Sequence, residues 1–213
     1  MSDAVHHPLF ARLWPRLAHQ FDRHGGTDHR RQLVAGLEGR VIEIGAGDGR
    51  NFAHYPVTVS EVVAVEPEAH LRGLAEERAV RAPVKVRVID GVAEQLPLDD
   101  GVFDAAVFSL VLCSVREPSA ALAEVRRVLR SGGRLRYFEH VVAPQGAAHR
   151  GVQRLLDAII WPRVGGGCHT ARDTLASIRQ SGLQVVDLER FAFPDSRIPM
   201  PTSPHIRGEA VVP

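Results

Sequence analysis

The sequence of 213 residues contains little lysine, little cysteine and few aromatic side chains. Lys85 is the only lysine among 26 basic residues, the formal net charge is +1, and the arginines are scattered instead of forming a stripe with interleaved aromatics. We therefore expect no nucleic-acid partner. Cys113 and Cys168 are too few for a disulfide framework and lack the spacing of a metal-binding pair, so no metal is expected either.

Long apolar runs are also missing. Between Met1 and Asp28, histidine and arginine residues interrupt the apolar positions, and no segment resembles a signal peptide or a membrane anchor. This pattern predicts a soluble, cytosolic protein. Its 45% hydrophobic and 24% charged residues suit one folded domain, without repeats or low-complexity tracts.

The order of the predicted elements indicates the fold class. Apolar spacing predicts a helix over 9–21 and a second helix over 28–37 that Asp28 caps. Strands then alternate with helices: strands at 40–44, 61–65, 84–89, 103–109 and 134–142, helices at 69–80 and 117–129, and a break at 131–133. Such alternation predicts a doubly wound α/β fold with helices on both faces of a parallel sheet.

The C-terminal third is less regular. We interpret residues 143–170 as an insertion beside the active site, with a helix at 151–160. A helix at 174–181 follows, and strands at 185–191 and 205–212 are expected to pair as an antiparallel hairpin at the sheet edge. The complete prediction is a Rossmann-like, seven-stranded, mostly parallel sheet that ends in this hairpin.

A glycine-rich turn, Gly45 to Gly49, follows the first predicted strand. In open α/β sheets ligands bind at this position, and glycine lets the main chain approach them closely. Glu66, at the end of the second strand, can accept hydrogen bonds from both ribose hydroxyls of an adenosine. Alone, the turn could be structural and Glu66 a solvated surface residue; together they favour an adenosine-containing cofactor.

Several phosphate-binding or hydride-transfer motifs are absent. Arg50 stands where a dinucleotide fingerprint has its third glycine, and no lysine follows the turn as a phosphate-binding loop requires. A Tyr-x-x-x-Lys pair is excluded because Arg81 lies four residues before Lys85. A cofactor without phosphates therefore fits best.

Four segments between residues 40 and 142 resemble, in family order, the motifs of class I S-adenosylmethionine-dependent methyltransferases of type 11. They are 43–49 (Glu-Ile-Gly-Ala-Gly-Asp-Gly), 93–97 (Ala-Glu-Gln-Leu-Pro), 103–104 (Phe-Asp) and 129–133 (Leu-Arg-Ser-Gly-Gly). The resemblance implies S-adenosylmethionine as the cofactor, and an N-terminal helical lid of residues 1–38 on a single methyltransferase unit of residues 39–213. Deleting residues 1–25 should then weaken cofactor binding by more than about tenfold.

The same resemblance assigns cofactor contacts by position. The expected contacts are Glu43, Gly45, Ala46, Gly47, Asp48, Glu66, Pro67, Ala93, Glu94, Ser109 and Leu110. Within this set, the glycines would line the methionine part, Asp48 would contact its ammonium group, and Ser109 and Leu110 would close the floor beneath the sulfonium. Val92 replaces an aspartate of many family members, which leaves the adenine amine to Glu94 or to backbone carbonyls.

Four further segments resemble the branch that includes the mammalian microsomal alkyl-thiol S-methyltransferases: 110–115 (Leu-Val-Leu-Cys-Ser-Val), 139–141 (Glu-His-Val), 167–172 (Gly-Cys-His-Thr-Ala-Arg) and 204–208 (Pro-His-Ile-Arg-Gly). This implies a small-molecule acceptor, with a thiol as first choice. A histidine could help a thiol to ionise. The candidate catalytic residues are His140, Cys168, His169 and His205, although a histidine here could equally bond the backbone, and Cys168 could be a small buried hydrophobe.

Other functions stay open at this point. One is O- or C-methylation in natural-product, lipid or quinone metabolism; another is a cofactor-binding module without catalysis. No Asn-Pro-Pro-Tyr-type motif follows the fourth strand, which argues against amino methylation of nucleic-acid bases. The predicted helix at 151–160 carries an apolar face that either packs in the core or covers an apolar substrate. This face, with the residue after the helix, consists of Leu155, Leu156, Ile159, Ile160 and Trp161. Both a monomer and a homodimer are compatible with the sequence.

Overall fold

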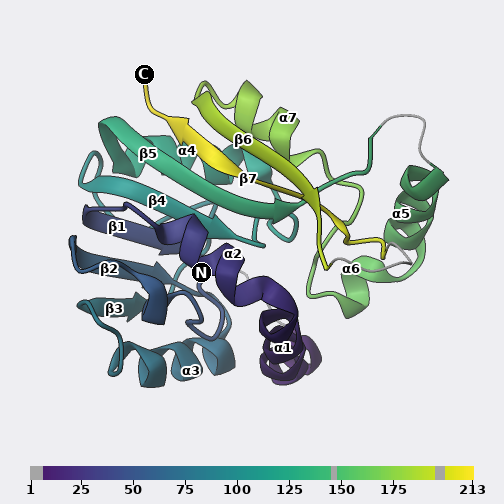
Figure 1. The fold of residues 1–213 in the computed structure, drawn as a ribbon, viewed down its shortest axis with the longest axis horizontal. Coiled ribbons are helices and arrows are strands. Elements are labelled where there is room, and N and C mark those ends of the chain that lie inside the picture. The colour runs from purple at the N-terminus through teal and green to yellow at the C-terminus, as the bar shows by residue number, and fades with distance from the viewer. Residues whose placement is uncertain (1–6, 145–147, 195–199) are drawn as a thin grey trace.

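A computed structural model describes residues 7–144, 148–194 and 200–213 (Figure 1). Its centre is a seven-stranded sheet in the order β3-β2-β1-β4-β5-β7-β6. The strands are β1 (Gly39–Ile44), β2 (Val59–Val65), β3 (Val86–Ile89), β4 (Phe103–Ser109), β5 (Leu129–His140), β6 (Gln184–Ala192) and β7 (Pro204–Val211). Strands β1 to β5 pair in parallel, whereas β7 is antiparallel to both β5 and β6. The predicted fold class is confirmed.

Helices cover both faces of the sheet (Figure 1). They are α1 (Pro8–Phe21), α2 (Thr27–Val34), α3 (Ala69–Ala79), α4 (Pro118–Val128), α5 (Ala148–Ile159), α6 (Trp161–Val164) and α7 (Thr174–Gln180). Successive strand residues point to opposite faces. Ile42 and Val63 therefore pack in one core with α4 and α7, whereas Val41 and Val62 pack in a second core with α2 and α3. Both faces of the parallel strands are buried, as such strands require.

The strand order places the site. Strand β1 has β2 on one side and β4 on the other, so the chain reverses its winding direction between β1 and β4. The loops that leave the carboxyl ends of neighbouring strands at such a point face one crevice, where open α/β sheets bind ligands. Here those loops begin at Gly45, Glu66 and Leu110.

The predicted break before the fifth strand is wrong. Strand β5 already begins at Leu129, which pairs with Phe103, and the next pair joins Ala105 to Arg134. The intervening residues, including Gly132 with a φ of 72°, form an irregularity inside the strand. Extra residues on one strand of a pair are accommodated as a bulge, so the glycines bend β5 instead of ending it.

Of two details near the chain termini, the cap of α2 differs from the prediction and the C-terminal hairpin agrees with it. Helix α2 begins one residue before Asp28, whose carboxylate accepts a hydrogen bond from Arg31 and caps nothing. The C-terminal hairpin forms at one edge of the sheet, as expected, with β6 outermost and β7 between β5 and β6. The last strand thereby brings His205 opposite His140 on β5.

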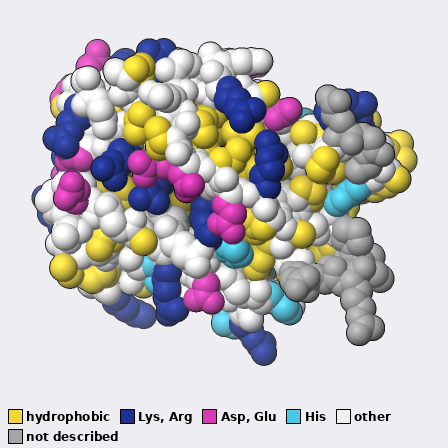
Figure 2. All heavy atoms as spheres, turned by 45° about the horizontal axis from the view of Figure 1, so that its top comes forward, with side chains coloured by type: hydrophobic (Ala, Val, Ile, Leu, Met, Phe, Trp, Pro, Cys, Tyr) yellow, Lys and Arg dark blue, Asp and Glu magenta, His cyan; other side chains and the backbone are white. Residues whose placement is uncertain are grey.

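Helices α5 and α6 lie beyond the end of the sheet (Figure 1). Leu155, Ile159 and Ile160 are 47 to 60% exposed, so packing in the core is wrong for these three. Figure 2 shows hydrophobic side chains at this end and charges of both signs interspersed over the rest of that face. Among the described residues, no helix combines the length and the apolar character needed to cross a membrane.

Candidate active site

The glycine-rich turn after β1 uses three left-handed glycines. Gly45, Gly47 and Gly49 have φ values of 68°, 57° and 77°. Residues with a Cβ rarely adopt this region, so the turn depends on glycine. The indole nitrogen of Trp14 lies 3.3 Å from where a Cβ at Gly47 would be, so α1 covers the turn closely.

Glu66 follows β2 directly and lies beside this turn. One carboxylate oxygen accepts a hydrogen bond from the backbone N–H of Gly47 at 2.8 Å, and the other accepts one from Glu68 at 3.0 Å. Burial raises the pKa of Glu66, and these two amides oppose the rise. Since each carboxylate oxygen has a second lone pair, two further hydroxyl donors can be accommodated. The next residue, Pro67, offers its carbonyl to Arg72.

Glu43 has a structural environment. Its carboxylate is buried and accepts hydrogen bonds from Asn51 at 2.9 Å and from the hydroxyl of Tyr55 at 2.7 Å. Burial raises its pKa to about 7. Both oxygens are thus occupied by groups of the protein, which hold the glycine turn from the interior side.

Asp48 already has two cationic partners. Its carboxylate is 1% exposed and lies 3.1 Å from the guanidinium of Arg50 and 2.9 Å from that of Arg78. Arg50 continues to Asp22 at 2.6 Å and to the carbonyl of Pro15, which connects the turn to the end of α1. The negative charge of Asp48 is therefore already balanced by two arginines of the protein.

Glu94, in the segment after β3, binds backbone N–H groups of the protein itself. Ala93 is buried, whereas the Glu94 carboxylate accepts hydrogen bonds from the backbone N–H groups of Arg116 at 2.8 Å and Glu117 at 3.3 Å. These amides lie at the start of α4, where unpaired N–H groups favour a carboxylate. This capping role leaves no local signal in the sequence, because Glu94 and the helix it caps are distant along the chain.

Ser109 and Leu110 form the exit of β4. Leu110 has a φ of 62°, the one positive value outside glycine among the described residues. Its backbone N–H donates to the carbonyl of Phe138 at 2.8 Å, which fixes the strained residue against β5. The hydroxyl of Ser109 accepts a hydrogen bond from the buried Arg30 at 3.4 Å, a contact that sequence reasoning did not foresee.

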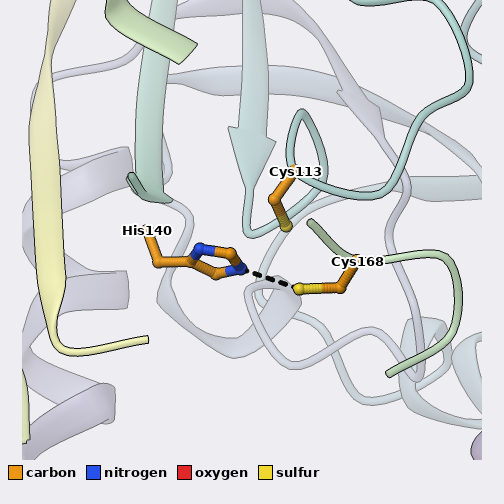
Figure 3. A group of neighbouring side chains, drawn as sticks. All are labelled: Cys113, His140 and Cys168. Carbon is orange, nitrogen blue, oxygen red and sulfur yellow. Dashed lines mark hydrogen bonds between the residues drawn. The ribbon is translucent and has the colours of Figure 1, made fainter. Parts of the chain in front are cut away.

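Three buried side chains meet where β4 and β5 end (Figure 3). The Nε2 atom of His140, the last residue of β5, lies 3.0 Å from the Sγ atom of Cys168. Cys113 follows β4, and one ligand atom from each of the three residues lies within 4.8 Å of the others. Nδ1 of His140 has no hydrogen-bond partner within the described ranges. We call these three residues the Cys-His-Cys cluster.

The charges in the Cys-His-Cys cluster depend on one another. A hydrogen bond from Cys168 and the charge of His140 hold the pKa of Cys113 well below its usual range, against the effect of burial. Burial alone would lower the pKa of His140, but the thiolate of Cys113 raises it above its ordinary value. The hydrogen bond to Cys113 and burial raise the pKa of Cys168. The cluster thus favours one thiolate beside an imidazolium.

The other two candidate histidines have different surroundings. His205 is buried beside three phenylalanine rings, and burial lowers its pKa to about 4; its ring is 6.2 Å from that of His140. His169 is 41% exposed and stands 4.0 Å from Asp157. The structure therefore brings together two of the four predicted residues, His140 and Cys168, and adds Cys113, which sequence reasoning left out.

The insertion is tied to the strands by two polar side chains of α5. Gln153 is completely buried; it accepts a hydrogen bond from Ala143 and donates to the carbonyls of Val141, Thr170 and Pro201. Asp157 accepts from the backbone N–H groups of Thr170 and Ala171 at 2.7 and 2.9 Å. These bonds place the segment that carries Cys168 beside β5.

Helix α1 reaches from the cofactor side to this insertion. Besides the contact of Trp14 with the glycine turn, the ring of Phe10 occupies the space where a Cβ at Gly166 would be. His7 lies 3.5 Å from the corresponding position at Gly167. One helix therefore covers both parts of the site.

Comparison with known proteins identifies the family. A family model described as methyltransferase domain matches residues 42–137. The thiol S-methyltransferase TMT1B of Rattus norvegicus is 37% identical over 80% of this chain and 70% of its own length. The chain belongs to the S-adenosylmethionine-dependent methyltransferases. The human thiol S-methyltransferase TMT1A is 31% identical to this methyltransferase over 84% of the chain and 74% of its own length.

Solved structures share the fold of this methyltransferase. A geranyl diphosphate methyltransferase in complex with S-adenosylmethionine has a TM-score of 0.70 at 15% identity, covering 99% of this chain and 94% of its own. A methyltransferase from Thermotoga maritima has a TM-score of 0.69 at 22% identity, covering 96% and 98%. S-adenosylmethionine is the cofactor of this family.

The residues at the carboxyl ends of β1 and β2 fit this cofactor. The turn at Gly45 to Gly49 brings bare backbone to the crevice, and the carboxylate of Glu66 retains acceptor capacity for two hydroxyls. Ala46 and Ala93, beside this turn and after β3, are both small and buried. S-adenosylmethionine has ribose hydroxyls whose hydrogen bonds a carboxylate can accept and a methionine part that an exposed backbone can approach, so both features suit it.

Proposed function

We propose that this methyltransferase acts in the cytosol, as a monomer or homodimer, and methylates the sulfur of a small, partly apolar thiol. The observation that carries the proposal is the Cys-His-Cys cluster at the ends of β4 and β5, beside the loop expected to hold the sulfonium. The relatives named thiol S-methyltransferase, at 31 to 38% identity, support the same acceptor class.

For the cofactor we propose a division of tasks. Gly45, Ala46 and Gly47 line the methionine part, and Glu66 receives the ribose hydroxyls. Pro67, Ala93 and Glu94 border the adenine, and Ser109 with Leu110 forms the floor beneath the sulfonium. Because Asp48 is paired with arginines and Glu43 with Asn51 and Tyr55, we propose that these two carboxylates act by holding the turn.

Methyl transfer needs alignment more than acid-base catalysis. When bound, S-adenosylmethionine supplies an activated methyl group on a sulfonium. The chain's residues have to orient the acceptor sulfur, exclude water and favour its thiolate. The imidazole of His140 that lowers the pKa of Cys113 would do the same for an acceptor thiol placed beside it. Apolar surroundings strengthen this electrostatic effect.

The acceptor is tested with matched pairs of compounds. Thiols and alcohols of the same carbon skeleton are incubated with S-adenosylmethionine, and the demethylated product is quantified. We expect turnover with the thiols and less than about one hundredth of it with the alcohols. Preference for alcohols, or for a quinone-type carbon acceptor, would instead favour the O- or C-methyltransferase alternative. Two relatives support that alternative: a ubiquinone/menaquinone biosynthesis C-methyltransferase at 29% identity and a demethylmenaquinone methyltransferase at 31%.

The ribose contact is tested by titration calorimetry with S-adenosylmethionine and its demethylated product. Glu66→Ala should weaken both by at least about 100-fold, since each of the two hydrogen bonds to a charged acceptor contributes roughly 1.5 to 3 kcal/mol. Glu68→Ala is the matched control, because its carboxylate caps α3 through Leu71. Equal losses in the two variants would contradict a direct ribose contact.

We propose that α1 is a lid over the cofactor. The contact between Trp14 and the glycine turn supports this. Removing residues 1–25 would also remove Asp22, the partner of Arg30 and Arg50, so Trp14→Ala is the sharper test. We expect about tenfold weaker cofactor binding with unchanged thermal stability; unchanged affinity would argue against the lid.

A further inference from the structure

We propose that the Cys-His-Cys cluster is a binding site for a thiophilic divalent cation of the zinc type, with its fourth coordination position open toward the acceptor. The potential ligand atoms are Sγ of Cys113, an imidazole nitrogen of His140 and Sγ of Cys168, and all lie within 4.8 Å of one another. All three residues are buried. Figure 3 shows the imidazole and both sulfurs converging on one point from three separate chain segments.

The donor set selects the class of cation. Thiolate and imidazole are the ligands of zinc and of related soft or borderline metals, whereas calcium and magnesium take oxygen donors. No carboxylate belongs to the cluster. Three protein ligands with a free fourth position are typical of catalytic zinc sites, since structural sites are usually closed by four.

The surroundings suit two thiolate ligands. Sγ of Cys168 receives a hydrogen bond from the indole N–H of Trp161 at 3.2 Å, and the hydroxyl of Ser114 lies 3.5 Å from Sγ of Cys113. N–H and O–H donors directed at sulfur stabilise its charged form and fix the ligands in place. The indole of Trp161 would do the same for Cys168 in a cation complex.

The backbone already holds the three segments together. The N–H of His169 donates to the carbonyl of Cys113 at 2.8 Å, which joins the two cysteine segments. Val111 and Leu112 donate to the buried carboxylate of Glu139, the residue before His140, at 2.9 and 3.2 Å. The ligands are therefore brought together by one backbone hydrogen bond and by the buried carboxylate of Glu139, contacts that do not require a metal, so the site is preorganised.

The role of the cation in methyl transfer rests on the proposed thiol acceptor, whereas the existence of the cation site does not depend on it. An acceptor thiol that takes the open position loses its proton to solvent and is held as a thiolate on the cation. Its sulfur lone pair then forms the new bond to the methyl carbon, and the bond between that carbon and the sulfonium breaks, so the products are a thioether and the neutral demethylated cofactor. The cation would replace the imidazolium as the group that stabilises the thiolate.

The test is cobalt titration of the full-length, reduced, chelator-treated protein. We expect one equivalent of Co²⁺ to produce thiolate-to-cobalt charge-transfer bands and the d–d bands of a tetrahedral site, and Zn²⁺ to displace it. Cys113→Ser and Cys168→Ser should each lose charge-transfer intensity, and His140→Gln should bind at least about tenfold more weakly. His169→Gln is the matched control and should behave like the wild type.

Two outcomes would overturn the proposal: no charge-transfer band in the wild type, or a band that Cys168→Ser leaves unchanged. If a variant fails to fold, the wild type provides a second test. Zn²⁺ should protect Cys113 and Cys168 of the wild type from alkylation. Equal labelling with and without Zn²⁺ would overturn the proposed site. Adding a small thiol, but not its alcohol counterpart, should shift the cobalt bands. Cobalt binding without thiol methylation would contradict the proposed function and leave the cation site standing.

Discussion

The two halves of the active site are held by different forces. Around the glycine turn, buried charges are paired: Asp22 with Arg30 and Arg50, and Asp48 with Arg50. Around the Cys-His-Cys cluster, the described residues form no salt bridge between an arginine and a carboxylate, and the segments are joined by hydrogen bonds; the buried amide of Gln153 alone makes hydrogen bonds to four backbone groups. In the proposed function, the first half fixes the backbone near a charged cofactor, and the second places thiols and aromatic rings around the acceptor.

The difference shows how each half can be changed. A buried ion pair depends strongly on both partners, because removing one leaves an uncompensated charge. A buried neutral network responds less to pH and salt, but every lost partner leaves a backbone group unsatisfied. We therefore expect the cofactor half to be sensitive to charge changes, and the acceptor half to changes of shape and hydrogen bonding.

The largest effect is expected for Arg30→Met. Arg30 is 5% exposed and binds Asp22, Asn51 and Ser109. Its loss should lower the free energy of unfolding by about 3 to 5 kcal/mol, measured by urea denaturation at pH 7. Arg31→Met is the matched control, because its ion pair is exposed and should contribute less than about 1 kcal/mol. Similar losses of unfolding free energy in both variants would contradict the expected difference between buried and exposed ion pairs.

The cofactor half could be predicted from the sequence because its parts are local. The glycine turn and Glu66 follow adjacent parallel strands, so strand order alone brings them together. The residues behind them were not found. Asn51 and Tyr55 reach Glu43, and Arg30 reaches Ser109, through contacts that depend on how the helices pack on the sheet.

The acceptor half was only partly predicted. His140 and Cys168 are site candidates by resemblance. Cys113 enters the sequence analysis only within the segment 110–115, and the spacing of the two cysteines is unlike that of a metal-binding pair. Cys113 follows β4 and His140 ends β5, so the pairing of these two strands was the signal that could have found it. The position of Cys168 depends on Gln153 and on the insertion, which no local pattern specifies.

The second effect is a pH dependence caused by His205. Burial lowers its pKa to about 4 from an ordinary value of 6.5, so between these values the unfolded chain binds more protons than the folded one. Stability from this group is complete above pH 6.5 and is lost as the pH falls toward 4, by about 3 kcal/mol.

His205→Phe should remove this loss, since three phenylalanine rings already surround the site. The measurement is the difference in unfolding free energy between wild type and variant at several pH values. Glu43, whose pKa is raised to about 7, changes in the opposite direction in both proteins and cancels in the difference. A difference that stays constant from pH 7 to pH 4 would show that His205 is not buried in neutral form.

The third effect is expected for Gln153→Met, which keeps the volume and removes the amide. Ala143, Thr170 and two further backbone groups would lose their partner, lowering the free energy of unfolding by about 2 kcal/mol. The KM for the acceptor should rise, and the affinity for the demethylated cofactor should stay within about twofold. The exposed Gln180→Met serves as control. A loss confined to cofactor affinity would mean that the halves are not independent.

The smallest effect, and the one that limits the comparison, is expected for Arg78→Ala. Arg78 is paired with the buried Asp48, but its own side chain is 44% exposed, and Arg50 remains on the same carboxylate. Solvent screens such a cation, so the loss should be below about 1 kcal/mol and should shrink further in high salt. Arg50→Met, whose side chain is 10% exposed, should lose several times more in the same urea experiment. If Arg78→Ala proved as damaging as Arg50→Met, Asp48 would need both cations at once, and the charges around the glycine turn would act as one cooperative unit instead of as separate pairs ranked by burial.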